Sequence, residues 1–454
     1  MTGRRHWCMR LVAAAALGIA AFSASAVGAG AAPGPDNARE YWFDNWQIPQ
    51  LWQQGARGQG ITIAEIDTGV NASIPEIAPN VLVGKDFGQA GDGRTDREIN
   101  EFGHGTAMAS IMVAHAGVLG ITGIAPDAKI LPLAVPLTGT SDAGGDDHLA
   151  EAIRYAADHG SKIISMSLGG TRKPATDAVP CPDTEQDAVY YALTKGAILL
   201  AASGNTGLTG NAVEEPGVCL GVISVGAVDQ NNVAANFSAR HPYLTIAAPG
   251  VNVPSLGRVR GSAYAGDGTS QATAIASAAV AIVWSKFPSQ TGRQIATRIL
   301  NTLDRHSATR SPAYGYGIIN PERAITTTVS PSAPNPVYAF AAPFVARYTA
   351  FSQSSAALPP PPAGTSGSAG SVSVGHSPRL SAPRVVEGLA SALAGLIGLL
   401  VLALVAVVGR RRPLRAPAAV PEGSTPGGLQ PSTDDAGLVW HEIIDPQRES
   451  DSFL

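Results

Sequence analysis

The chain has 454 residues, a formal net charge of −4, 45% apolar residues and 15% charged residues. The charged share lies below the roughly 25% of an average globular protein, which excludes a wholly disordered polyelectrolyte. The slightly negative charge gives no support to nucleic-acid binding. We therefore expect a globular body with added segments. The next step is to find which segments of the chain contain the many apolar residues.

The first 26 residues have the layout of a secretory signal peptide. Three arginines precede an apolar, alanine-rich run over residues 11–22, which is too short to span a bilayer comfortably. A small-residue cleavage signal follows at Ala24-Ser25-Ala26, with a second option ending at Ala31. The sequence therefore predicts export and removal of residues 1–26, with cleavage as late as residue 31 as the alternative.

Residues 33–58 form a short segment that is rich in aromatic side chains. It holds half of the six tryptophans of the chain. The aromatic residues are Tyr41, Trp42, Phe43, Trp46 and Trp52. Such a composition favours an arm that packs on the body over a free linker.

Residues 59–326 alternate apolar, β-branched runs with helical patterns. The predicted strands are Ile61–Ile66, Lys129–Val135, Ile163–Ser167, Ala197–Ala201, Val222–Val225 and Leu244–Ile246. The predicted helices are Ala107–Ala114, Asp147–His159, Asp183–Thr194, Gln271–Lys286 and Gln290–Leu303. Apolar strands that alternate with helices predict an α/β fold whose mostly parallel sheet is covered on both faces.

Two of the three cysteines lie in this body. Cys8 leaves with the signal peptide, whereas Cys181 and Cys219 remain as a pair in an oxidising, exported setting, so a disulfide is expected. Neither cysteine has a Cys-x-x-Cys or histidine partner nearby, so no metal site is expected there.

The C-terminal part predicts a stalk, a membrane helix and a tail. Residues 327–386 are rich in Pro, Ser, Ala and Gly and predict an extended stalk. Residues 388–409 are 22 residues without a charge, enough to cross a hydrocarbon core of about 30 Å. Four arginines follow closely, so the positive-inside rule places residues 410–454 in the cytoplasm and the body outside the cell membrane.

Asp67-Thr68-Gly69 directly follows the first predicted strand. Functional groups collect beyond the carboxyl ends of strands in open α/β sheets, although an isolated Asp there is as readily a turn residue. Asp-Thr-Gly is also the motif of aspartic proteases, which need two such carboxylates. Because no second copy occurs, we set that class aside.

Two further motifs place polar side chains at helix starts. Gly103-His104-Gly105 opens one helical run, and Gly268-Thr269-Ser270 opens another. Taken alone, His104 is more often structural and Ser270 is more often a helix cap. A nucleophilic serine there would instead lie in the positive end of the helix dipole.

Taken together, these motifs indicate a function far more specifically than any one of them does alone. The order Asp67, His104, Ser270 is the order of the subtilisin-type triad, and Asn205 follows the strand Ala197–Ala201. With Gly123-Ile-Ala-Pro-Asp-Ala-Lys129 and Ser165-Met-Ser-Leu-Gly-Gly170, the chain over about residues 50–325 resembles the subtilase family of serine peptidases.

The resemblance implies a subtilisin-like three-layer fold and a serine endopeptidase that acts on protein or peptide substrates without a cofactor. It implies a catalytic triad of Asp67, His104 and Ser270, with Asn205 and the Ser270 backbone N–H binding the oxyanion. The segment implied to pair with the substrate backbone consists of Ser167, Leu168, Gly169 and Gly170.

Two positions depart from the family pattern. Glu65 stands at an otherwise apolar strand position, two residues before Asp67 and on the same side of the strand, where burial would raise its pKa or a basic group would pair with it. After Ser270, the sequence Gln271-Ala272-Thr273-Ala274 lacks the apolar residue and the proline often found there.

The layout of signal, short arm, stalk, anchor and basic stop resembles the mycosins, the membrane-anchored subtilases of type VII secretion systems. The tail after residue 409 is longer than expected for that group. The hypotheses are an active anchored endopeptidase associated with type VII secretion components, a structural clamp of a secretion complex in which cleavage is secondary, and a general cell-surface protease.

Overall fold

The computed structural model describes residues 40–137, 147–171 and 181–349, apart from residues 340, 344, 347 and 348, together with the pair 441–442. The predicted signal peptide, the predicted membrane helix and most of the predicted stalk and tail lie outside the described residues. Within the part of the chain that is described, no helix combines the length and apolar character needed to span a membrane.

A parallel sheet of seven strands forms the centre of the body, in the order β2-β3-β1-β4-β6-β8-β9. Its strands are β1 (Thr62–Asp67), β2 (Lys85–Asp86), β3 (Lys129–Ala134), β4 (Ile163–Met166), β6 (Ile198–Ala202), β8 (Val222–Val228) and β9 (Ile246–Pro249). Every pairing in it is parallel. This confirms the predicted α/β class and most of the predicted strands.

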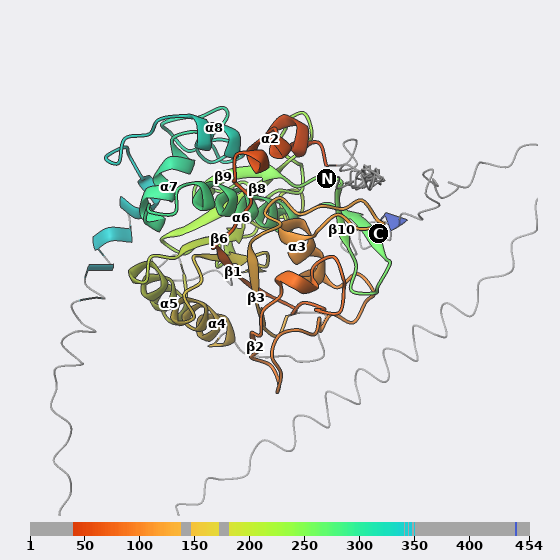
Figure 1. The fold of residues 1–454 in the computed structure, drawn as a ribbon. Helices are drawn as coiled ribbons and strands as arrows, with labels where there is room; N and C mark the ends of the chain where they lie inside the picture. The colour runs from red at the N-terminus through yellow and green to blue at the C-terminus, as the bar shows by residue number, and fades with distance from the viewer. Residues whose placement is uncertain are drawn as a thin grey trace, which may run out of the picture. The chain divides into compact units, whose positions relative to one another are not determined.

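Helices cover both faces of this sheet (Figure 1). The helices are α1 (Trp42–Asn45), α2 (Ile48–Gln53), α3 (His104–Val113), α4 (Asp147–Asp158), α5 (Asp183–Thr194), α6 (Thr269–Lys286), α7 (Gly292–Leu300) and α8 (Pro321–Thr326), with a 3₁₀ turn at Ala78–Asn80. Alternate strand residues divide between two cores, as a pleated strand requires. Ile63 joins the core that includes α3 and α6, whereas Ala64 joins the core under α4 and α5.

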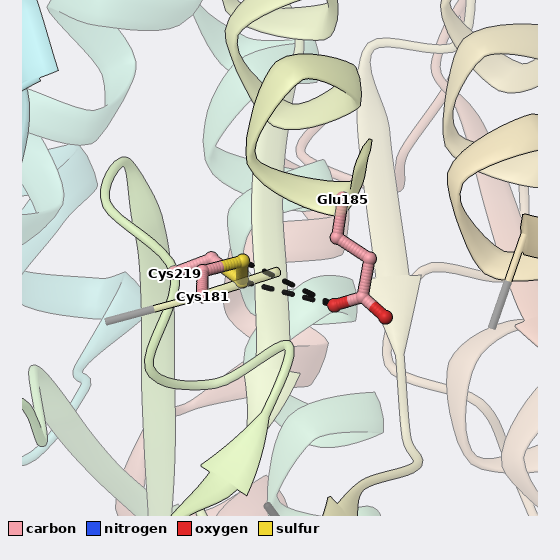
Figure 2. Close-up of side chains that lie close together, drawn as sticks. All are labelled: Cys181, Glu185 and Cys219. Atoms are coloured by element: carbon pink, nitrogen blue, oxygen red, sulfur yellow. Dashed lines mark hydrogen bonds between the residues drawn. A yellow bond between two sulfur atoms is a disulfide. The ribbon is translucent and has the colours of Figure 1, made fainter. Parts of the chain in front are cut away.

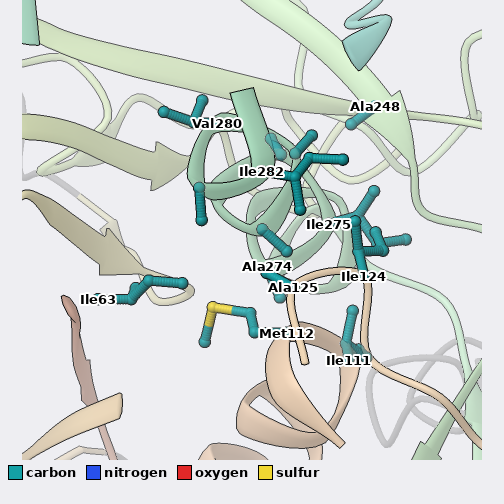
Figure 3. Close-up of a cluster of buried hydrophobic side chains, with 14 of the residues drawn as sticks. Ile63, Ile111, Met112, Ile124, Ala125, Ala248, Ala274, Ile275, Val280 and Ile282 are labelled. Atoms are coloured by element: carbon teal, nitrogen blue, oxygen red, sulfur yellow. The ribbon is translucent and has the colours of Figure 1, made fainter. Parts of the chain in front are cut away.

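The central helix α6 is buried along its length except for Ser270 and Lys286. Small side chains such as Ala274 let it lie close to α3 and to the sheet, as Figure 3 shows for Ala274, Met112 and Ile63. A helix that is apolar on all sides is expected only where packing surrounds it. This burial fixes the position of the first turn of α6, which carries Ser270.

The aromatic arm is part of the larger core. Trp42, Phe43 and Trp46 are each at most 4% exposed and pack in the same cluster as α3 and α6.

The body also extends further than predicted at its C-terminal end. Val337 and Tyr338 are buried, and the Asn335 side chain donates to Thr297 Oγ1 at 3.0 Å. The predicted stalk start at residue 327 is therefore wrong, because apolar side chains within a proline- and serine-rich segment pack on the body.

Three short pairings complete the fold. Strand β5 (Gly170–Thr171) pairs antiparallel with β7 (Glu214–Glu215), and β10 (Val253–Leu256) pairs antiparallel with β11 (Ala263–Gly266). Strand β12 (His441–Glu442) lies parallel to β11. The sequence did not predict these strands, and the predicted strand Leu244–Ile246 ends where β9 begins. Short strands with glycine and proline carry weak β patterns.

Candidate active site

Three predicted site segments leave neighbouring strands at the same edge of the sheet. Asp67 ends β1, Ser167 follows β4, and Asn205 lies three residues after β6. These strands are adjacent in the order β1-β4-β6, and their parallel pairing brings their carboxyl ends together. Strands β2 and β3 lie on one side of β1 in the sheet, and β4, β6, β8 and β9 lie on the other. The strand order therefore reverses at β1, and α/β folds form their binding sites at the carboxyl ends of the strands beside such a reversal.

Asp67 and His104 form a close pair. His104 Nδ1 lies 2.8 Å from Asp67 Oδ1 and 2.9 Å from Oδ2. Asp67 is completely buried, whereas 24% of the His104 side chain is exposed. Because the carboxylate can only accept, Nδ1 carries the proton and Nε2 is left to accept one. The pair has the geometry of an oriented general base.

A second buried carboxylate, Asp96, supports this pair. Its Oδ1 accepts the Thr68 hydroxyl at 2.9 Å, and its Oδ2 accepts the Thr106 hydroxyl at 2.6 Å and the Thr106 N–H at 2.8 Å. The Glu98 carboxylate also accepts the backbone N–H of His104. Asp96 and Glu98 were missed by the sequence reasoning, because a polar loop between two motifs carries no periodic signal.

The glycines of the two motifs permit a close backbone contact. An added Cβ on Gly105 would lie 2.2 Å from the carbonyl oxygen of Gly69, and Gly69 itself has a φ of +92°. The Thr68 hydroxyl accepts the Gly105 N–H at 2.9 Å across the same contact. The start of α3 therefore lies against the loop that follows β1, which brings His104 to Asp67.

The electrostatics of the site favour the charged form of His104. Burial of the ring opposes protonation, but the charge and hydrogen bond of Asp67, with the charges of Glu98 and Asp96, outweigh it and raise the pKa of His104 to about 9. A group with this pKa accepts protons most effectively at alkaline pH.

The start of α6 holds Asn205 in one orientation. Asn205 Oδ1 accepts both the backbone N–H and the hydroxyl of Thr269, each at 2.9 Å. The amide oxygen is thereby engaged, and among the described residues the amide nitrogen donates to no partner. Ser270, the next residue of α6, is half-buried. In the part of the chain described, no hydrogen bond joins its hydroxyl to His104, which is common in ligand-free sites.

The segment that follows β4 changes from buried to exposed. Ser167 and Leu168 are buried, whereas Gly169 and Gly170 are exposed. Gly170 pairs on one side with Glu215 of β7. The four predicted substrate-pairing residues therefore leave the carboxyl edge of the sheet beside Asn205 and reach the surface.

Glu65 lies on the α6 side of β1 and is 1% exposed. Neither of its carboxyl oxygens has a hydrogen-bond partner in the described part of the chain. Burial raises the pKa of Glu65 well above its usual range, and the charges of Asp67 and Asp96 raise it further. Of the two alternatives, burial and not a basic partner accounts for the raised pKa of this residue.

Cys181 and Cys219 are joined by the predicted disulfide. Their sulfurs lie 4.0 Å from Glu185 Oε2 (Figure 2). A disulfide sulfur has no proton to donate and is not a thiolate, so we interpret this as a packing contact. The bridge ties the start of α5 to the segment before β8.

A family model described as the subtilase family matches residues 58–317, more than half of the chain. The chain belongs to the subtilase family. Among curated relatives of this subtilase, Subtilisin Savinase from Lederbergia lenta is 34% identical over 279 residues, which is 61% of this chain and 95% of the relative. Thermitase from Thermoactinomyces vulgaris is 35% identical over 291 residues, or 64% and 96% of the two chains.

Solved structures agree with this assignment. The MycP3 protease from the type VII (ESX-3) secretion system is 29% identical to this subtilase, with a TM-score of 0.56. The match covers 66% of this subtilase and 90% of the MycP3 chain. MycP1 from Mycobacterium smegmatis is also 29% identical, with coverage of 65% and 88% and the same TM-score. The subtilase is a serine endopeptidase with mycosin-like structural neighbours.

Proposed function

We propose that this subtilase cleaves peptide bonds through Asp67, His104 and Ser270, with Asn205 binding the oxyanion. The observation that carries the proposal is the 2.8 Å contact between His104 Nδ1 and buried Asp67, which directs the proton to Nδ1 and leaves Nε2 to act as the acceptor. The Thr269–Asn205 hydrogen bonds support it, because they couple the residue before Ser270 to the proposed oxyanion donor.

The chemistry proceeds through an acyl-enzyme. Ser270 Oγ attacks the scissile carbonyl carbon while His104 Nε2 takes its proton. Asn205 Nδ2 and the Ser270 N–H hold the oxygen that gains negative charge. His104 then protonates the leaving amine, the C–N bond breaks, and water repeats the sequence to release the acid. Asp67 stabilises the charged imidazole throughout.

Peptide hydrolysis by matched serine variants tests this assignment. Ser270→Ala should lower kcat by about 10⁶-fold, the loss known for a subtilisin. Ser289→Ala, at an exposed position after the other end of α6, is the control and should retain full activity. Normal hydrolysis by Ser270→Ala would overturn the assignment.

We also propose that the protease domain lies outside the cell membrane, anchored by residues 388–409, with the tail after Gly409 in the cytoplasm. The signal-peptide pattern, the uncharged 22-residue run and the arginines after it support this topology. The pairing of β12 with β11 is incompatible with it, since residues 441–442 cannot reach the body across a membrane.

A tag at the C-terminus decides between the two arrangements. The cells should have an intact cytoplasmic membrane but no outer layer that excludes proteins. An added protease should then leave the C-terminal tag uncut, because that tag lies in the cytoplasm. The protease should remove a second tag that is inserted before residue 388. Removal of both tags would favour the β12 pairing and contradict the anchored topology.

Association with type VII secretion is proposed from the mycosin-like neighbours, one of which is described as an essential component of the type VII (ESX-1) secretion system. Deletion of this subtilase should block secretion by such a system in its own cell, and the wild-type chain should restore it. If Ser270→Ala also restores secretion, the role is structural. Secretion that is normal after deletion would indicate a general surface protease.

A further inference from the structure

Residues 96–103 lead into α3 and carry two of the charges that act on His104. These charges belong to Asp96 and Glu98, and the Glu98 carboxylate also accepts the His104 backbone N–H. The segment itself forms neither helix nor strand. Its position is therefore fixed by contacts with other parts of the fold, because it has no regular backbone hydrogen bonds of its own.

The turn between β10 and β11 supplies such contacts through Arg258. The Arg258 backbone N–H donates to the carbonyl oxygen of Phe102 at 3.0 Å. Its guanidinium donates from Nη1 to the carbonyl oxygen of Asp96 at 3.5 Å, and from Nη2 to that of Ile99 at 3.1 Å. One residue of a neighbouring turn thus holds the loop before α3 at three points.

Gly103 lets Arg258 lie directly against the residue before His104. An added Cβ on Gly103 would lie 2.4 Å from Arg258 Cβ and 2.8 Å from Asp96 Oδ2. The φ of Gly103 is +68°, a conformation that also favours glycine. The glycine before His104 is therefore needed for the approach of Arg258 as well as for the path of the backbone.

The same turn is joined to the loop that follows β1. Asn71 Nδ2 donates to the Arg258 carbonyl oxygen at 2.7 Å, and the Asn71 N–H donates to the Thr106 hydroxyl of α3 at 3.0 Å. Arg258 is thereby held by the segment that follows Asp67. Its position is tied to both residues of the Asp67–His104 pair.

We propose that Arg258 is a positioning residue of the catalytic site, which keeps residues 96–103, and with them Glu98, in place against His104. The argument rests on the proposed function, because it concerns the base of that reaction. A guanidinium can bind two carbonyl oxygens at once through its rigid planar fork, whereas a lysine ammonium is a point charge on a flexible stem. Arg258→Lys therefore keeps the charge and removes the two-point contact.

Peptide hydrolysis by Arg258→Lys tests the proposal. Its kcat should fall about 10-fold, because a small displacement of the base lowers turnover. Its KM should change little, because residues 167–170, which we propose to pair with the substrate, are not among those that Arg258 binds.

The pH dependence of kcat/KM reports on the placement of Glu98. The charges that act on His104 are those of Asp67, Glu98 and Asp96, and each raises the pKa of His104. Release of Glu98 in Arg258→Lys should therefore shift the midpoint of kcat/KM to lower pH. A variant that was only less stable would keep the wild-type midpoint.

Two further variants make the test specific. Arg260 is exposed in the same turn, and within the described part of the chain its side chain binds no other residue. Arg260→Lys should therefore leave kcat and the midpoint unchanged. In a Glu98→Gln background, Arg258→Lys should lower the midpoint by less than it does in the wild type, because the charge through which it acts is already gone.

The outcomes separate the proposal from the proposed function. Wild-type kcat and midpoint in Arg258→Lys, or a fall in the midpoint that is equally large in the Glu98→Gln background, would overturn the role of Arg258. If Arg258→Lys does not fold, Asn71→Ala frees the Arg258 carbonyl oxygen and should lower both values; unchanged values would overturn the role as well. Absence of Ser270-dependent fluorophosphonate labelling in the wild type contradicts the proposed function itself.

Discussion

At the scale of single residues, the charge state of His104 sets the pH at which the protein works. Its pKa is raised to about 9, so below that pH the imidazole holds a second proton and cannot accept one from Ser270. We expect kcat/KM to rise with pH, with a midpoint far above the usual 6.5 of a histidine. Glu98→Gln removes one nearby charge, keeps an acceptor for the His104 N–H, and should lower the midpoint. A wild-type midpoint at or below 6.5 would contradict this account.

Glu65 gives a second expectation at this scale. Its pKa is raised in the folded protein, so the folded state holds one more proton than the unfolded state once pH exceeds the ordinary value of a glutamate. Stability should therefore fall as pH rises through this range, by up to about 1.4 kcal/mol per pH unit. Glu65→Gln removes this dependence.

Chemical unfolding at pH 4 and pH 7 measures the effect. The free energy of unfolding of Glu65→Gln relative to wild type should increase between the two pH values. The same comparison for Glu151→Gln, an exposed position on α4, should show no such increase. Equal behaviour of the two variants would mean that Glu65 is charged in the folded protein.

At the scale of elements, the first turn of α6 connects the nucleophile to the oxyanion donor. Thr269→Val removes the hydroxyl that binds Asn205 Oδ1 but keeps the backbone N–H that also binds it. Since Asn205 then loses one of two restraints, kcat should fall about 10-fold with little change in KM; complete loss of an oxyanion donor costs about 10²–10³ in a subtilisin.

Thr273→Val is the matched control for this variant. Thr273 lies one turn later in α6 and is also buried; within the described part of the chain its hydroxyl donates to the carbonyl oxygen of Thr269 and has no other partner. We expect only Thr269→Val to lose turnover, and we expect it to lose more stability than Thr273→Val, because the Thr269 hydroxyl also accepts the buried Gly204 N–H at 3.2 Å. Equal turnover in the two variants would show that the Thr269 hydroxyl does not position Asn205.

At the scale of the whole molecule, the aromatic arm belongs to the core and not to a separate segment. Trp42 is 2% exposed and packs in the cluster that holds α3 and α6. Trp42→Ala should lower the free energy of unfolding by about 3–5 kcal/mol, because a buried aromatic leaves a large cavity. Asn45→Ala, exposed in the same helix, should change it by less than about 0.5 kcal/mol. A small loss for Trp42→Ala would mean that the arm detaches readily.

Local patterns were sufficient to predict five of the seven strands of the central sheet, β1, β3, β4, β6 and β8, and the helices α3 to α7. The strand Ile61–Ile66 is apolar apart from Thr62 and Glu65, and Asp183–Thr194 matches α5 at both ends. The contact between Asp67 and His104 was also predictable. Each residue lies in a short motif, and the two motifs occur in the order that is known for the subtilase family. The strands, the helices and each short motif depend on residues that are close in sequence, whereas the pairing of Asp67 with His104, 37 residues apart, was predicted from the order of the motifs.

The remaining features depend on pairing over long distances. Asp96 becomes part of the site only because Thr68 and Thr106 converge on it. Glu214 comes to face Gly169 through the β5–β7 pairing, which joins segments more than 40 residues apart with two residues in each strand. Such short strands give no alternating pattern, so no sequence signal places this carboxylate.

The central claim is that Ser270 is the nucleophile of a serine endopeptidase. Its most direct test is to treat the full-length protein with a fluorophosphonate and to locate the modified residue by mass spectrometry. The account predicts one phosphonylated site, at Ser270, that disappears in Asp67→Asn as the base loses its orientation. Modification at another serine, or none at Ser270 in the wild-type protein, would contradict it.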